Sequence, residues 1–200
     1  MDIYNTENQN RDYLLQKIVE KKLFSDSLIL IDKEVPVPYK HIYIPNNPQT
    51  TLEIWCFKQD ICVYQELIKK NVGYKDAIFV SKHDRDQDII NIKLEKDSSQ
   101  KSHPVGLPYV IIETKMGKNI NTHELLAYSE KVQMIKTIFP FSRFMMLFFG
   151  EPPTRAYRHG LYFDEIEYIN NFDDESINNI CKVIKDLYKN AIHDIVCMKA

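Results

Sequence analysis

Apolar residues between positions 10 and 23 recur at a spacing of about 3.6, which predicts an amphipathic helix near the start of the chain. Residues 27–31 form a short run rich in β-favouring residues. The prolines that follow, at positions 36, 38, 45 and 48, predict an extended or loop-like segment up to about residue 49. Regular structure is therefore expected to resume near residue 52.

The segment from 52 to 70 combines two periodicities. Residues 52–56 alternate in part as a strand does, whereas Ile61, Tyr64, Leu67 and Ile68 have helical spacing. We therefore predict a strand followed by a helix that ends before Gly73.

Three strand candidates follow in succession, at 76–82, 88–95 and 108–115. The third contains the run YVIIE, which is apolar without alternation, as expected for a strand that is covered on both faces. The remaining pattern predicts a helix, two strands and a C-terminal helix, at 122–139, 144–149, 161–168 and 174–193. This order indicates an α/β fold.

Composition places the chain among globular proteins with one core, because 44% of its 200 residues are hydrophobic and 27% are charged. Its five glycines and nine prolines are spread without a linker-like tract. We therefore expect a single domain over 1–200, with an N-terminal extension over about 1–50 and a C-terminal helix over about 174–193.

Charge and cysteine content narrow the function classes. The net charge of −2 lacks the basic excess of a pure phosphate-binding protein, although a local cluster of lysines or arginines could still bind phosphates. The four cysteines lack the spacing of a zinc site. No apolar run approaches the length of a bilayer span, and the N-terminus is polar, so we expect a cytoplasmic protein without membrane contact.

Two charged residues end the apolar strand at 108–115. Glu113 and Lys115 are two positions apart, so their side chains point to the same face of the strand. Burying such charges is costly unless each is paired or binds a metal. The pair is therefore either an ion pair at the solvated end of a strand or part of a metal-dependent active site.

The segment IIETK resembles the (D/E)XK motif of the PD-(D/E)XK nuclease superfamily, and the resemblance covers residues 61–150. It implies a restriction-endonuclease-like core with the element order αβββαβ, in which a mixed central sheet is flanked by helices. It also implies that Glu113 helps to bind Mg²⁺ or Mn²⁺ and that Lys115 orients the attacking water or stabilises the transition state.

The superfamily completes its metal site with an aspartate at the start of the antiparallel strand beside the (D/E)XK strand. Two aspartates begin predicted strands here, Asp76 and Asp88. A simple antiparallel meander of the three strands would place Asp88 beside Glu113. If residues 83–107 instead lie outside the central sheet, Asp76 takes that position. Both remain candidate catalytic and metal-binding residues.

The resemblance to this superfamily also implies an accessory role for further residues. Glu124 and Tyr128 are four apart on the predicted helix, with Lys131 one turn further, similar to the QxxxY motif of RecB-like members. Glu124 stands where that motif has glutamine, and a solvated helix face would show the same spacing. Glu66 could be the additional acidic residue of some members, or a surface residue.

Three arginines, Arg143, Arg155 and Arg158, would suit phosphate contacts, or could lie in a solvated loop. The resemblance implies a Mg²⁺-dependent endonuclease that hydrolyses DNA phosphodiester bonds, either a type II restriction endonuclease or a related defence or repair nuclease. DNA is then the partner, and a homodimer is expected. The alternatives are a non-catalytic subunit that retains the fold and a nuclease acting on RNA or branched DNA.

Overall fold

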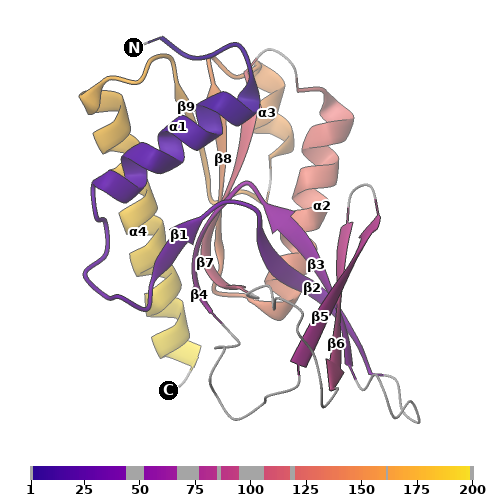
Figure 1. Cartoon of the computed structure of the whole chain (residues 1–200). Helices are drawn as coiled ribbons and strands as arrows, with labels where there is room; N and C mark the ends of the chain where they lie inside the picture. The colour runs from indigo at the N-terminus through magenta and orange to yellow at the C-terminus, as the bar shows by residue number, and fades with distance from the viewer. Residues whose placement is uncertain are drawn as a thin grey trace.

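A computed structural model of the chain describes residues 2–43, 52–66, 77–84, 87–94, 106–117, 120–160 and 162–198. Within these residues one sheet has five strands, in the spatial order β1 (Leu30–Asp32), β4 (Ile61–Glu66), β7 (Gly106–Met116), β8 (Arg143–Phe149) and β9 (Glu165–Ile169). A second sheet has the spatial order β2 (Val35–Tyr43), β3 (Leu52–Gln59), β6 (Gln87–Leu94) and β5 (Ala77–Asp84). The helices are α1 (Glu7–Glu20), α2 (Thr122–Ile138), α3 (Thr154–His159) and α4 (Asp174–Met198) (Figure 1).

The five-stranded sheet is mixed. Strand β4 pairs antiparallel with β1 and β7, whereas β8 pairs in parallel with both β7 and β9. Helix α2 makes the crossover between the parallel strands β7 and β8, as a parallel pair requires. The expected α/β fold, with a mixed central sheet flanked by helices, is confirmed.

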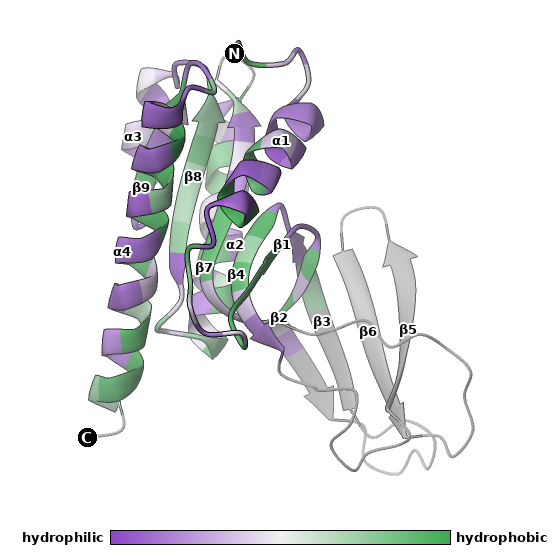
Figure 2. Cartoon of the chain, turned by 60° about the vertical axis from the view of Figure 1, so that its left-hand side comes forward, coloured by the Kyte–Doolittle hydropathy of each residue, from purple (hydrophilic) through white to green (hydrophobic). Residues whose placement is uncertain are grey.

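Helices cover both faces of this sheet (Figure 1). Leu14 of α1 and Ile184 of α4 join one buried cluster with Ile112 of β7. On the other face, Val132 of α2 packs in a cluster with Ile111. Figure 2 shows the resulting pattern, in which β4, β7 and β8 are mainly hydrophobic between helices whose outer faces are hydrophilic. In the described part of the chain, none of the helices combines the length and apolar character needed to cross a bilayer.

The segments with the clearest periodicity have the secondary structure that was predicted for them. The helices predicted at 10–23, 122–139 and 174–193 are present as α1, α2 and α4, and the strands predicted at 108–115 and 144–149 are β7 and β8. These segments are long or continuously apolar, so tertiary packing and local pattern agree.

The helix predicted from Ile61 to Ile68 is wrong, because this segment begins with strand β4. Ile61, Cys62, Val63 and Tyr64 are all buried, since β4 lies inside the sheet between β1 and β7. A strand covered on both faces shows no alternation, and its apolar run can match helical spacing by chance. Glu66 therefore lies on a strand rather than on a helix.

The expected interruption of regular structure at Pro36 and Pro38 is also wrong, because both residues belong to strand β2, although the backbone there is extended as predicted. Strand β2 is at the edge of the second sheet, and its pairing with β3 shifts register between Pro38 and Lys40. Proline lacks an N–H donor, and an edge strand with a bulge accommodates it without losing a buried hydrogen bond.

The antiparallel meander considered for the three predicted strands does not form. Strand β6 pairs with β3 and β5, and β7 pairs instead with β4 and β8. Asp88 therefore lies in the second sheet, in register with Cys56 and His83. Asp76 is outside the described residues, and β5, which follows it, pairs with β6 rather than with β7.

Gly117 follows β7 directly and packs against the end of β8. Its N–H donates to the Phe149 carbonyl at 2.9 Å, and a Cβ atom there would lie 2.7 Å from the Gly150 carbonyl oxygen. We expect Gly117→Ala to lower the free energy of unfolding by about 1–3 kcal/mol, because neither backbone can easily move. Urea denaturation measures this, and an unchanged midpoint would contradict it.

Burial of Tyr64 on β4 raises the pKa of its hydroxyl to about 12, with the carboxylates of Asp32 and Glu66 adding to the effect. A pKa raised on folding gives stability that is complete below the unfolded value of about 10 and is lost as pH rises toward 12. Tyr64→Phe should therefore lose less stability than the wild type over this range, by up to about 2–3 kcal/mol. Denaturation midpoints at pH 9 and at a pH near 12 give the comparison, and parallel losses in both proteins would contradict it.

Candidate active site

Asp60 lies directly before strand β4, beside the end of β7 that carries Glu113. Strand β4 pairs with β7 so that its first residue, Ile61, is opposite Ile112, the residue before Glu113. The negative charge of Asp60 also raises the pKa of Glu113, in agreement with this proximity. An aspartate other than the predicted Asp76 or Asp88 thus lies near Glu113 at the end of β7.

Glu113 is buried, with 4% of its surface exposed. Its carboxylate accepts a short hydrogen bond from the Lys131 ammonium, which also contacts the Lys58 carbonyl oxygen at 3.4 Å. Burial raises the pKa of Glu113 above its ordinary value, and Lys131 and Lys115 only partly oppose this shift. The buried carboxylate would therefore be stabilised further by a stronger positive charge.

Lys115 lies on the same strand and has a different partner. Its ammonium donates to a Glu7 carboxylate oxygen at 2.9 Å, and it lies 5.2 Å from the centre of the Tyr128 ring. Burial alone would lower the pKa of Lys115, but Tyr128 and Glu7 more than offset this and hold it above its ordinary value. Lys115 is therefore protonated at neutral pH.

The Asp60 carboxylate is held in place by the strand that carries Glu113. One oxygen, Oδ2, accepts from both the backbone N–H and the hydroxyl of Thr114, each at 2.9 Å. The other oxygen, Oδ1, lies 3.4 Å from a guanidinium nitrogen of Arg11. These contacts fix the orientation of the Asp60 carboxylate.

These side chains fit a hard divalent cation. Carboxylate oxygens are the ligands that Mg²⁺ prefers, and Mg²⁺ commonly uses one or two carboxylates while keeping several waters. Within the described residues, no group of three or more His, Cys, Asp or Glu side chains is arranged to hold a metal. The candidate centre therefore consists of two carboxylates, and an ion bound there would compete with Lys131 for Glu113.

Two of the predicted accessory residues reach this centre and two do not. Tyr128 and Lys131 of α2 contact Lys115 and Glu113. Glu124 instead accepts from the Asn121 N–H at 2.8 Å, within the capping box that starts α2. Glu66 is opposite Gly106, at the other end of β4, about 15–20 Å along the strand from Asp60.

The three arginines that were predicted to contact phosphates do not gather at one site. Arg143 pairs with Asp164 and with Asp194 of α4. Arg155, on α3, donates to the Ile120 carbonyl oxygen at 2.6 Å. Arg158 is exposed on the same helix. The structure therefore does not gather these arginines around Glu113.

Asp60 and Glu7 are the functional candidates that the sequence reading missed. Asp60 stands directly before the buried run Ile-Cys-Val-Tyr, and reading that run as a strand would have identified it. Glu7 is 108 positions from Lys115 along the chain, and no local pattern connects the two.

No protein-family model matches the chain, and no curated protein is significantly similar to it. A functional proposal for this protein therefore depends on the geometry of its own residues.

Proposed function

We propose that this protein is a Mg²⁺-dependent nuclease of the PD-(D/E)XK type that hydrolyses DNA phosphodiester bonds, as a type II restriction endonuclease or a related defence or repair nuclease. The observation that carries this proposal is that the Asp60 carboxylate bonds to Thr114, the residue between Glu113 and Lys115. An aspartate at the start of the neighbouring antiparallel strand is the feature that the sequence alone left without a definite residue.

The arrangement of elements supports the same proposal. The order αβββαβ that the resemblance implies for residues 61–150 is found instead over residues 7–149, in α1, β1, β4, β7, α2 and β8, when the strands of the second sheet are left out. In space, β1, β4, β7 and β8 are neighbours, with β7 and β8 parallel. The strands β2–β3 and β5–β6 are then insertions, which form the second sheet.

In this proposal Asp60 and Glu113 would hold the cation, which supplies a Lewis acid for the phosphate and lowers the pKa of a bound water. Lys115 remains an ammonium and stabilises negative charge that develops on the phosphate. Glu7 and Tyr128 orient the Lys115 side chain toward this end of β7. Thr114 and Arg11 hold the Asp60 carboxylate in place.

One observation favours a second candidate, a non-catalytic subunit that keeps the fold. Glu113, Lys115 and Asp60 each have a charged or hydrogen-bonding partner without any metal: Lys131, Glu7 and Thr114. The cluster could therefore serve stability alone. In that case a divalent cation would neither bind nor stabilise the protein.

A cleavage assay separates the two candidates. Supercoiled plasmid, linear duplex, branched DNA and RNA are each incubated with the protein and Mg²⁺, Mn²⁺ or EDTA. We expect metal-dependent cleavage of DNA that is lost in Glu113→Gln and retained in Glu124→Gln, whose side chain caps a helix. Failure to cut any DNA substrate, or equal cutting by Glu113→Gln, would reject the nuclease proposal, and preferential cutting of RNA would change its substrate.

The expected homodimer is tested separately. Two-fold dimers place two active sites on the two strands of a symmetric DNA site. Sedimentation equilibrium should therefore give twice the mass of the chain.

A further inference from the structure

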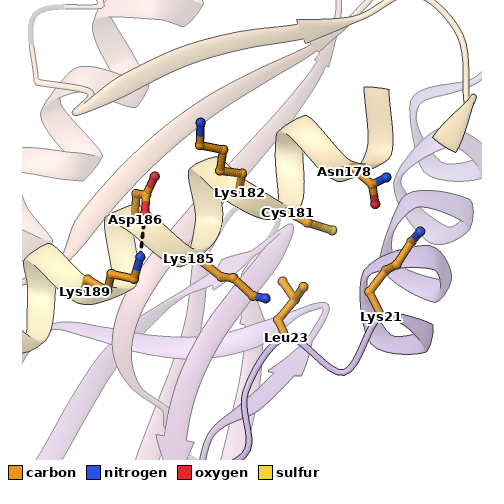
Figure 3. Close-up of a pocket in the computed structure, with 8 residues that line it drawn as sticks. All are labelled: Lys21, Leu23, Asn178, Cys181, Lys182, Lys185, Asp186 and Lys189. Atoms are coloured by element: carbon orange, nitrogen blue, oxygen red, sulfur yellow. Dashed lines mark hydrogen bonds and ion pairs between the residues drawn. The ribbon is translucent and has the colours of Figure 1, made fainter. Parts of the chain in front are cut away.

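A groove of about 390 Å³ lies between the C-terminal end of α1 and the helix α4 (Figure 3). Four lysines line it, Lys21, Lys182, Lys185 and Lys189, and Asp186 is the acidic residue among its lining side chains. We call this groove, with its four lysines, the lysine groove. Four positive charges against one negative charge contrast with the net charge of −2 of the whole chain. Positive charge is thus concentrated here.

The charges of the lysine groove are only partly neutralised. Lys189 pairs with Asp186 at 2.9 Å, and Lys21 lies 3.7 Å from Asp174, a fully solvated side chain with 92% exposure. Lys182 and Lys185 are exposed and form no ion pair among the residues that the structure describes. Two cations are therefore available to an anionic partner.

Two of the lysines, Lys21 and Lys185, flank a common floor. Cys181 is buried at the base of the groove, and burial raises the pKa of its thiol while the charges of Lys21 and Lys185 oppose that shift. In Figure 3 the ammonium groups of Lys21 and Lys185 lie on either side of Cys181. Cations from two separate elements thus converge on one recess, which a flat bilayer surface would contact poorly.

The spacing suits a regular polyanion. Lys182, Lys185 and Lys189 follow one face of α4, and the first and last are separated by about 10 Å at 1.5 Å per residue. Phosphates of one DNA strand advance about 3.4 Å each along the duplex axis, so this face spans about three of them. Lysine ammonium groups bind such phosphates as point charges without reading sequence.

We propose that the lysine groove binds the phosphate backbone of a nucleic acid, as an exosite apart from the candidate active site. Glu7, beside Lys115, and Lys21 stand at opposite ends of α1, about 21 Å apart along the helix axis. That distance corresponds to about six base pairs of duplex. Whether this nucleic acid is also cleaved rests on the proposed function, whereas binding at the groove does not.

Fluorescence anisotropy with a labelled duplex of about 30 base pairs, in EDTA, tests the proposal. We expect Lys182→Ala/Lys185→Ala to weaken binding for any DNA sequence, and to reduce the slope of log K against log salt by about 1.8, or 0.9 for each lost phosphate contact. Lys182→Arg/Lys185→Arg should retain binding. The control is Lys33→Ala/Lys136→Ala, which removes two lysines already paired with Asp12 and Asp164 and should leave the slope unchanged.

The exosite would be overturned by no DNA binding by the wild type, by an unchanged affinity and slope in Lys182→Ala/Lys185→Ala, or by an equal loss in the control. If Lys182→Ala/Lys185→Ala lost binding to phosphatidylserine vesicles but kept its DNA binding, the groove would be assigned to membranes and the exosite proposal would also be overturned. The two proposals fail separately. Groove-dependent binding without Mg²⁺-dependent cleavage rejects the nuclease alone, and cleavage with an unchanged salt slope rejects the exosite alone.

Discussion

Asp60→Asn is expected to abolish Mg²⁺-dependent DNA cleavage while the protein stays folded. Asparagine keeps an oxygen that can accept from the Thr114 N–H and hydroxyl, but it removes one of the two negative charges at the candidate centre. Changes in groups that merely support a metal ligand commonly cost 10- to 100-fold, so loss of a ligand charge should cost at least about 100-fold. Single-turnover rates on plasmid DNA measure this loss.

A matched control for this substitution is Asp88→Asn. Asp88 begins a predicted strand as a metal-site aspartate should, yet its strand β6 pairs with β3 and β5 in the second sheet. We expect this variant to cleave at the wild-type rate. Normal cleavage by Asp60→Asn, or an equal loss in Asp88→Asn, would show that the carboxylate beside Glu113 is not the one that matters.

Lys131→Met should be the most destabilising of the charge changes at this centre. It leaves the Glu113 carboxylate, which is 4% exposed, without its ammonium partner. Removing one partner of a buried ion pair typically costs about 3–5 kcal/mol, much more than loss of an exposed pair. Urea denaturation should show this loss, whereas Lys189→Met, which breaks the exposed pair with Asp186, should change stability by less than about 1 kcal/mol.

A double-mutant cycle identifies the cause of that loss. If it arises from the unpaired carboxylate, adding Glu113→Gln to Lys131→Met should recover most of the lost stability. Mg²⁺ should also raise the melting temperature of Lys131→Met more than that of the wild type, because the ammonium no longer competes for Glu113. Additive effects of the two substitutions would contradict this account.

The sequence makes Glu113 and Lys115 candidates because the pattern that selects them is local. Both end a long apolar strand, and the twofold repeat of strand side chains puts them on one face without any knowledge of the fold. Tyr128 and Lys131 are candidates by their resemblance to the QxxxY motif, which is likewise contained in one predicted helix. In each case the informative residues are within a few positions of one another.

The partner carboxylate was missed for a physical reason. Which strands are neighbours in a sheet depends on long-range packing, and here β4 pairs with a strand whose residues are about 50 positions away. The run after Asp60 was interpreted as a helix, since a strand buried on both faces and a buried helix share the same apolar character. Because the run was predicted as a helix, Asp76 and Asp88 became the candidate aspartates. The lysine groove lies between two separate helices, so no local pattern could predict it.

The two inserted hairpins, β2–β3 and β5–β6, affect how the protein folds. The chain leaves the five-stranded sheet after β1 and again after β4, so β1, β4 and β7 can pair only after two long loops have closed. Closing such loops costs entropy before any contact compensates for it, which slows folding. The second closure brings Asp60 to the β7 segment that carries Glu113, so the divalent-ion affinity that we propose should be acquired only after this closure.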